Sequence, residues 1–299
     1  MRKNHDMDLS VIVVSYNTAD LIGPCLASVI DQTVGDKEIF VVDNASPDGS
    51  AAMIADSFPD VHLIANKENR GFSVANNQAI AQCRGRHVFF LNPDTVLKED
   101  CLSTSLSYLG AHPEIGLAGL HILNPDGTDQ DSVSYRYLSQ RYTSGELSNL
   151  PGDIACVLGA AMIAPREAII SVGGFDEDYF LYGEDEDLCL RIRRQGLKIG
   201  YIEAARVVHY HGQSERKSTS AEVWRKKIRA EYLFYDKHYR PETITRIIRA
   251  EMLKTRWRIL TLKICLPFIK NKGQAKEKLN KYKVIHDELR RRKISRTDR

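Results

Sequence analysis

The sequence predicts an α/β fold: a Rossmann-like, mostly parallel central sheet flanked by helices, with a basic helical C-terminal extension. Three observations lead to this prediction. Short apolar runs alternate with stretches of helical spacing, polar residues follow each run directly, and the charge changes sign near residue 220. The chain of 299 residues is long enough for one large domain and an appendage. We expect these parts to be residues 1–220 and 221–299.

The alternation is clearest at the start of the chain. Residues 9–17 begin as an apolar run and stop at polar residues, which predicts a buried strand, and residues 18–33 have helical spacing. Residues 38–42 repeat the strand pattern and end at Asp43. A weaker helix and strand follow over 51–65. Strands that alternate with helices predict a parallel, doubly wound sheet.

The strand expected over 88–91 delivers a carboxylate to the edge of this sheet. It follows a helix expected over 74–84 and ends at Asn92 and Pro93, because proline cannot donate the next ladder hydrogen bond. Asp94 therefore lies at the C-terminal edge of the sheet, where open α/β folds bind ligands. A carboxylate there suits a divalent cation or a sugar phosphate. An Asx-type turn cap is the alternative for an isolated Asn-Pro-Asp.

The second half of the chain is less regular, but apolar runs still predict strands between turn residues. We expect a strand over 116–123, a turn at 124–127 and a polar loop or lid over 128–152. A strand over 156–164, a short helix over 165–172, a helix over 188–195 and one or two strands over 198–210 complete this half. From residue 221 we expect basic helices that are interrupted at Pro241 and Pro267.

Charge and cysteine content limit the partners and the compartment. Residues 221–299 contain 24 Lys and Arg but 9 Asp and Glu, a net charge of +15, whereas residues 1–220 carry −12. The arm therefore suits an anionic partner: a membrane surface, a phosphorylated lipid or a nucleic acid. Six cysteines form no Cys-X-X-Cys pair, which indicates buried thiols in a reducing compartment and no zinc site. We find neither a signal peptide nor a spanning apolar run and expect a cytoplasmic protein.

Two more segments are candidates for nucleotide contacts. Asp43 either closes a turn or accepts hydrogen bonds from a ribose hydroxyl or a base N–H, as acids do at this position in nucleotide-binding folds. In the loop over 69–73, Gly71 lets the backbone approach a phosphate and Arg70 could pair with it. By itself, an Arg-Gly turn does not distinguish a ligand loop from an ordinary turn.

Four consecutive carboxylates, from Glu184 to Asp187, precede the helix expected over 188–195. They can form a charged first turn, which the helix dipole favours. Helical geometry also sends them to different faces, so that one or two can enter a cleft while Asp187 pairs with Arg191. A carboxylate among other carboxylates has a raised pKa, which suits a general base.

His209 and His211 follow an apolar strand end. Residues two apart in an extended segment share a face, so both imidazoles are candidate metal ligands. The alternative is the polar rim of a sheet.

In their order along the chain, these motifs resemble those of glycosyltransferase family 2, in the branch that adds rhamnose and related sugars to bacterial polysaccharides. The resemblance covers about residues 8–216 and rests on the whole set of motifs. The matching segments are 13–17, 42–46, 69–77, 91–94, 174–180 and 183–188 with Arg191, and then His209 with Ser214.

The resemblance implies a GT-A fold and an inverting transfer from a nucleotide-diphosphate sugar, with Mg²⁺ or Mn²⁺. It implies that Asp94 is a metal ligand and that His209 completes the shell, His211 being the less suited histidine. It also implies that Asp185 is the catalytic base, with Glu184 as a substitute. Asn92 stands where the family has the first Asp of its Asp-X-Asp motif, which leaves the metal fewer charged ligands. The donor site would include Ser15, Asn17, Asp43, Arg70, Gly71, Asn77 and Asn92.

This division of roles agrees with the chemistry. A hard cation at Asp94 neutralises charge on the leaving diphosphate. A second carboxylate takes the proton of the acceptor hydroxyl as the anomeric carbon becomes oxocarbenium-like. By resemblance we expect a dTDP-sugar such as dTDP-rhamnose first and UDP-sugars second, and a hydroxyl of a polysaccharide or lipid-linked glycan as acceptor.

The basic arm has several interpretations. Residues 257–269 are apolar, flanked by basic residues and too short to span a bilayer, which predicts an interfacial segment on anionic lipid. Such a segment would bring the enzyme, on the inner face of the cell membrane, to a lipid-diphosphate acceptor. A second docking helix or a homodimer contact is the alternative, and we expect no nucleic-acid partner. A helix that docks on the core is predicted by Trp224, Ile228, Tyr232, Leu233 and Tyr235.

Two other classes of protein stay open as alternatives. A nucleotidyltransferase usually has a Gly-rich loop with a lysine after its first strand, whereas Ser15-Tyr16-Asn17-Thr18 stands there in this chain. A non-catalytic binding module would explain the basic arm but not the carboxylates at strand ends.

Overall fold

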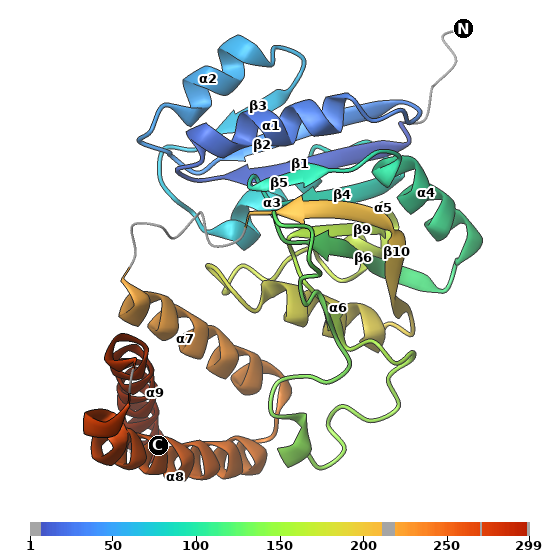
Figure 1. The fold of residues 1–299 in the computed structure, drawn as a ribbon. Helices are drawn as coiled ribbons and strands as arrows, with labels where there is room; N and C mark the ends of the chain where they lie inside the picture. The colour runs from blue at the N-terminus through green and yellow to red at the C-terminus, as the bar shows by residue number, and fades with distance from the viewer. Residues whose placement is uncertain (1–6, 211–218, 270, 298–299) are drawn as a thin grey trace, which may run out of the picture. The chain divides into compact units, whose positions relative to one another are not determined.

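The computed structural model describes residues 7–210, 219–269 and 271–297, which fall into two compact units (Figure 1). The first, here called the sheet unit, comprises residues up to 137 and from 149 to 214. The second, the helical unit, comprises residues 138–148 and the chain from 215 onward. A functional boundary at residue 220 stays a prediction.

The sheet unit contains an eight-stranded sheet in the order β3-β2-β1-β4-β9-β6-β10-β5. β1 (Leu9–Ser15) pairs in parallel with β2 (Lys37–Asp43) on one side and β4 (His87–Leu91) on the other. β2 also pairs in parallel with β3 (His62–Ala65). The predicted parallel half of the sheet is confirmed, and the carboxyl ends of its strands lie along one edge.

The other half of the sheet is mixed. β9 (Ala161–Pro165) lies antiparallel between β4 and β6 (Ile115–Leu123). β10 (Lys198–His209) runs parallel to β6 and antiparallel to β5 (Thr95–Leu97). The antiparallel pairing of β10 with β5 returns the chain from residue 209 to the turn at Asp94.

The strand predicted over 156–164 is wrong as a single element. β8 (Cys156–Val157) pairs with β7 (Val133–Ser134) in a separate small sheet, and the chain then turns through Leu158–Ala160 before β9 begins. Gly159 interrupts the apolar run at this turn. The predicted loop over 128–152 therefore contains the short strand β7 and a 3₁₀ turn, η1 (Gln140–Tyr142).

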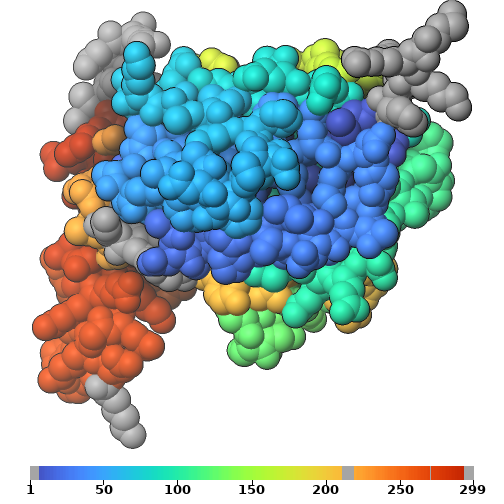
Figure 2. Space-filling model, turned by 90° about the horizontal axis from the view of Figure 1, so that it is seen from above, coloured from blue at the N-terminus to red at the C-terminus, as the bar shows by residue number. Residues whose placement is uncertain are grey.

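Both faces of the sheet are buried under helices, which explains why its central strands are continuously apolar. Alternate residues of β1 enter different cores: Val11 and Val13 pack on one face, whereas Ile12 and Val14 pack on the other. Figure 2 shows one face of the unit, formed mainly by the first third of the chain. The first core is covered by α1 (Ala19–Ile30), α2 (Ser50–Ser57) and α4 (Cys101–Ala111), and the second by α3 (Phe72–Ile80), α5 (Arg166–Ser171) and α6 (Glu184–Arg194).

The helical unit contains α7 (Ser220–His238), α8 (Pro241–Cys265), the 3₁₀ turn η3 (Leu266–Phe268) and α9 (Lys272–Thr297). Thr219 and Glu222 form a capping box at the start of α7. The predicted interruption at Pro241 is confirmed, because this proline occupies the first turn of α8. A backbone N–H at this position would have no partner within the helix, so its absence in proline costs nothing. In the described residues, no helix combines the length and the hydropathy needed to cross a bilayer.

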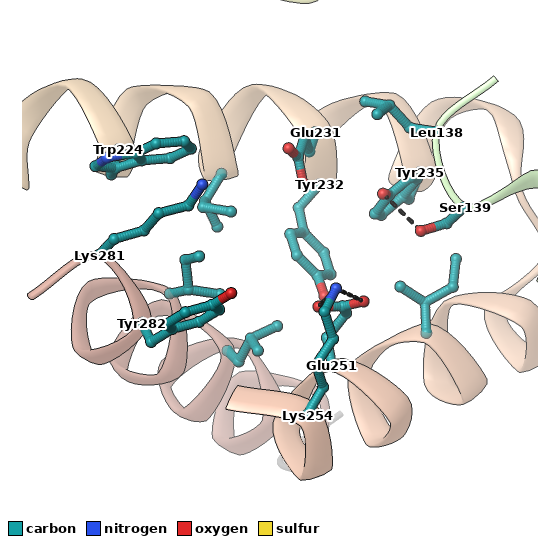
Figure 3. Close-up of a pocket in the computed structure, with 14 residues that line it drawn as sticks. Leu138, Ser139, Trp224, Glu231, Tyr232, Tyr235, Glu251, Lys254, Lys281 and Tyr282 are labelled. Carbon is teal, nitrogen blue, oxygen red and sulfur yellow. Dashed lines mark hydrogen bonds and ion pairs between the residues drawn. The ribbon is translucent and has the colours of Figure 1, made fainter. Parts of the chain in front are cut away.

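A cavity of about 230 Å³ lies among the three helices of this unit (Figure 3). The Lys281 ammonium lies 3.5 Å from the centroid of the Trp224 ring. Burial, and to a smaller extent the nearby Glu251, raises the pKa of Glu231 to about 7. Four of the residues that predict a docking helix line this cavity: Trp224, Ile228, Tyr232 and Tyr235. Docking of this helix on the core stays a prediction.

Candidate functional site

Asp43 and Ser15 lie side by side at the carboxyl ends of β2 and β1, because the strand register pairs them directly. Asp43 is buried, and its Oδ1 accepts the Ser46 N–H at 2.9 Å. Its Oδ2 is also buried and has no hydrogen-bond partner in the described residues. A buried acceptor without a donor is destabilising, so this oxygen is suited to receive a donor group from a ligand.

Asn17 supplies a second acceptor close to this edge. It adopts a left-handed conformation with φ of 56°, and the Ser46 hydroxyl accepts its backbone N–H at 3.0 Å. Its Oδ1 is buried and unpaired within the described chain. The Ser15 hydroxyl, in contrast, shares a 2.8 Å hydrogen bond with the Thr18 hydroxyl. Of Ser15, Asn17 and Asp43, the last two therefore have an oxygen that can still accept a hydrogen bond.

The loop containing Arg70 and Gly71 is held by Asn44, a buried residue that the sequence analysis did not select. The Asn44 amide donates to the Gly71 carbonyl at 3.0 Å. Gly71 has φ of +85°, and a Cβ there would lie 2.8 Å from the carbonyl oxygen of Phe180. Only glycine fits this position. The Arg70 side chain is exposed on a loop whose backbone is fixed.

Asn77 positions a second loop. Its Nδ2 donates to the Phe175 carbonyl at 2.8 Å and to Glu177 Oε1 at 3.1 Å, and its Oδ1 accepts the Phe175 N–H at 2.9 Å. Both functions of this amide are engaged within the protein. The structure therefore gives Asn77 a positioning role, and its predicted contact with the nucleotide stays a prediction.

Asp94 and His209 meet although they lie 115 positions apart in the sequence, because β5 and β10 pair His209 with Thr95. Both side chains are buried, and Asp94 Oδ1 lies 3.3 Å from His209 Nε2. This is within ion-pair distance, yet Oδ1 has no hydrogen-bond partner of good geometry among the described residues. The other ring nitrogen, Nδ1, lies 3.0 Å from Gln130 Oε1. If Nδ1 donates to Gln130, the lone pair is at Nε2 and faces Asp94.

This geometry fits two ligands of one cation. Two ligand atoms at about 2.1 Å from a hard cation and at right angles are about 3.0 Å apart, close to the observed 3.3 Å. Asn92, two residues before Asp94, has a half-buried side chain. Within the described chain, no cluster of three or more His, Cys, Asp or Glu side chains could hold a metal ion. His211 and Ser214 lie outside the described residues.

The four carboxylates from Glu184 to Asp187 all lie in the first turn of α6, which begins four residues before the predicted start. Gly183, with φ of 80°, allows the chain to enter the helix this early. The predicted pairing of Asp187 with Arg191 is confirmed: Arg191 Nε donates to the fully buried Asp187 Oδ2 at 2.6 Å. Arg191 Nη1 also donates to the carbonyls of Val172 and Gly174, each at 2.8 Å. This pair therefore anchors the turn that precedes Phe175.

Glu184 and Asp185 differ in their surroundings. Glu184 is buried and its Oε2 has no hydrogen-bond partner in the part of the chain that is described. Burial, and then the neighbouring Asp185, raises the pKa of Glu184 to about 8. Asp185 is half-buried, and its carboxylate accepts the Gly159 N–H at 3.0 Å and the Glu186 N–H at 2.8 Å. Burial also raises the pKa of Asp185, although the two N–H groups oppose the shift.

The turn over 158–160 joins the two acidic sites. Gly159 donates to Asp185, and the next carbonyl, that of Ala160, accepts the Asn92 N–H at 2.9 Å. A Cβ on Gly159 would lie 3.3 Å from the Cβ of Asp185, so a side chain there would press on that residue. Adjacent residues of one short segment, Gly159 and Ala160, are thus hydrogen-bonded to the Asp185 carboxylate and to the turn that contains Asp94.

Comparisons with known proteins match most of this unit. A family model described as "Glycosyl transferase family 2" matches residues 10–173, and one described as "N-terminal domain of galactosyltransferase" matches residues 140–213. The chain is 26% identical over 236 residues to an N-acetylglucosaminyl-diphospho-decaprenol L-rhamnosyltransferase of Mycobacterium tuberculosis, covering 69% of this chain and 77% of the relative. It is 28% identical over 185 residues to the rhamnosyltransferase WbbL of Escherichia coli, covering 54% and 70%.

A solved structure shares the fold. The mannosyltransferase PcManGT from Pyrobaculum calidifontis, in complex with GDP-Man and Mn²⁺, matches with a TM-score of 0.60 and 18% identity. The match covers 95% of this chain and 87% of that one.

Proposed function

Since the chain belongs to glycosyl transferase family 2 and has the GT-A fold, we propose that it moves a sugar, with inversion, from a nucleotide-diphosphate sugar to a glycan hydroxyl. That the chain is a glycosyltransferase follows from the family. Two observations support the rest: Asp94 lies against His209, and the turn over 158–160 is hydrogen-bonded both to Asp185 and to Asn92, two residues before Asp94. Rhamnose as the sugar and a lipid-linked glycan as the acceptor rest on the names of the relatives.

The donor would bind across the carboxyl ends of β1 and β2. The unpaired Asp43 Oδ2 and Asn17 Oδ1 would accept hydrogen bonds from a ribose hydroxyl or a base N–H. The exposed Arg70 would pair with a phosphate, with Gly71 keeping the backbone close. A thymine or uracil base offers one such N–H, which agrees with a dTDP- or UDP-sugar.

Asp94 and His209 would hold a divalent cation, Mg²⁺ or Mn²⁺. Their fit rests on the orphaned Asp94 Oδ1 and on the 3.3 Å separation of oxygen and ring nitrogen. When bound, the cation would supply positive charge for the leaving diphosphate. Asn92 stands in place of the first carboxylate of the usual pair, so the protein contributes one negative charge at this turn, that of Asp94. The diphosphate itself would supply the remaining negative charge that balances the cation.

Asp185 would act as the base. As the bond from the acceptor oxygen to the anomeric carbon forms and the bond to the diphosphate breaks, the acceptor proton passes to the Asp185 carboxylate. The N–H groups of Gly159 and Glu186 fix the orientation of this carboxylate. Its burial raises its proton affinity, as a base requires.

A thermal-shift screen tests the donor and cation sites without knowledge of the acceptor. The protein is heated with dTDP, UDP or GDP, each with Mg²⁺, Mn²⁺ or a chelator. A ligand at about 100 times its Kd stabilises the folded state by about 2.7 kcal/mol, so one nucleotide should raise Tm in a metal-dependent manner.

Two variants make the screen specific. Asp94→Ala should remove the metal dependence of the shift, and Asp43→Ala should weaken the nucleotide shift whether or not metal is present. The assignments of Asp43 and Asp94 are both wrong if no diphosphate changes Tm with any metal.

A further inference from the structure

α8 has two apolar faces, and only one of them is buried in the helical unit. Ile244, Ile247, Ile248 and Thr255 are buried. Five large apolar side chains on another face are instead exposed, at spacings of four, three, four and four residues, which keeps them on one side of a helix. This apolar stripe consists of Leu253 (69% exposed), Trp257 (65%), Leu260 (51%), Ile264 (61%) and, in η3, Phe268 (86%).

The exposed large apolar side chains of the protein are concentrated in the stripe. In the described residues, eleven large apolar side chains are exposed, and five of them lie on this one line. Scattered exposed apolar residues are ordinary, whereas a contiguous row indicates a surface that is covered in use.

The charges beside the stripe have a single sign. Residues 252–276 contain seven Lys and Arg and no Asp or Glu. Arg249, Arg256 and Lys263 recur every seven residues, so they form a row along one flank of the stripe, and all three are exposed. The acid nearest to the stripe in sequence, Glu251, faces the cavity on another side of α8 and pairs with Lys254 (Figure 3).

We infer that the apolar stripe docks on a membrane surface of anionic phospholipid. Its apolar side chains, with Trp257 and Phe268 among them, enter the boundary between headgroups and acyl chains, and the row of cations meets the phosphates. The helix lies along the membrane surface, because another of its faces is buried in the helical unit. This inference goes beyond the proposed function and does not rest on it.

Charge argues against a second copy of the chain as the occupant. A two-fold interface brings the same patch onto itself, so the cations of one segment 252–276 would face those of the other, and this segment contains no acid to pair with them. A nucleic acid would satisfy the cations but would leave five large apolar side chains in water. An anionic bilayer satisfies both parts of the surface.

Vesicle flotation with the full chain tests this inference. The protein should float with phosphatidylcholine vesicles that contain phosphatidylglycerol and much less with phosphatidylcholine alone. The double variant Trp257→Glu with Ile264→Glu should lose flotation. The matched control Ile170→Glu, which places a charge at an exposed apolar position of the sheet unit, should retain it. Neutralising Arg249, Arg256 and Lys263 to Gln should weaken binding by about fivefold for each cation, since each contributes about 1 kcal/mol at such a surface.

Fluorescence locates the contact. The chain has two tryptophans, so in a Trp224→Phe variant the emission reports Trp257 and should shift to shorter wavelength on vesicle binding. The inference is overturned if the wild-type chain does not float with anionic vesicles. It is also overturned if the double variant floats as well as the wild type, or if the variant changes only the oligomeric state in size-exclusion chromatography.

Discussion

Replacing Asp185 with Asn tests the proposed base while keeping the size of the side chain. The carboxylate accepts two backbone N–H groups, from Gly159 at 3.0 Å and from Glu186 at 2.8 Å. An amide can accept only one of them well, so the variant should lose about 1 to 3 kcal/mol of stability but still fold. Turnover should fall roughly 100- to 10,000-fold, because no group remains to take the acceptor proton.

Glu184→Gln is the matched control. Burial raises the pKa of Glu184 to about 8, so this side chain is mainly protonated at neutral pH, and a neutral amide reproduces that state. Turnover of this variant at neutral pH should therefore stay near that of the wild type. The assay is release of nucleoside diphosphate from the sugar donor, with the nucleotide thermal shift confirming that both variants bind it.

The reasoning is refuted if Glu184→Gln loses as much turnover as Asp185→Asn, or if Asp185→Asn keeps wild-type turnover. The first result would make Glu184 the base. The second would exclude Asp185 as the group that takes the proton of the acceptor hydroxyl.

Two further predictions concern stability. Arg191→Met should lower the free energy of unfolding by about 3 kcal/mol in a urea titration, because it leaves the fully buried Asp187 without its partner; a loss below about 1 kcal/mol would mean that Asp187 is not held by this pair. Glu231→Gln should stabilise the chain above about pH 7 by about 3 kcal/mol and have little effect near pH 4. The sign follows from the raised pKa: between about 4.5 and 7 the folded state keeps a proton that the unfolded state has lost, so wild-type stability falls as pH rises through this window. A difference between Glu231→Gln and wild type that does not depend on pH would contradict the raised pKa.

Local patterns predicted the parts of the fold that depend on neighbouring residues. β1, β2 and β4 are continuous apolar runs because both of their faces are buried, and such runs are visible in the sequence. The Asp187–Arg191 pair is likewise a matter of one helical turn.

Features set by tertiary structure were not predictable in the same way. The strand expected over 156–164 divides because its first part pairs with β7 and its second with β4 and β6. The contact of Gly159 with Asp185 depends on that division, so the spacing of residues in the sequence does not predict it. Asn44 was overlooked since its role, holding Gly71, becomes visible only when the loops are placed. The resemblance implies a metal-ligand role for His209, which stays a prediction, and the pairing of β5 with β10 gives the physical reason for its position beside Asp94.

The helical unit cannot be removed by cutting the chain once. Residues 138–148 belong to it although they interrupt the sheet unit in sequence. Tyr239 donates to the Leu138 carbonyl at 2.5 Å, and Thr243 donates to Glu146 at 2.5 Å. A protein truncated after residue 214 would keep this eleven-residue insert without the helices that satisfy it, and would leave the Leu138 carbonyl and Glu146 without these two hydroxyl donors. An engineer who wishes to graft the sheet unit onto another partner domain should therefore also replace 138–148 with a short turn, and should treat insolubility of a simple truncation as a property of the insert and not of the sheet unit.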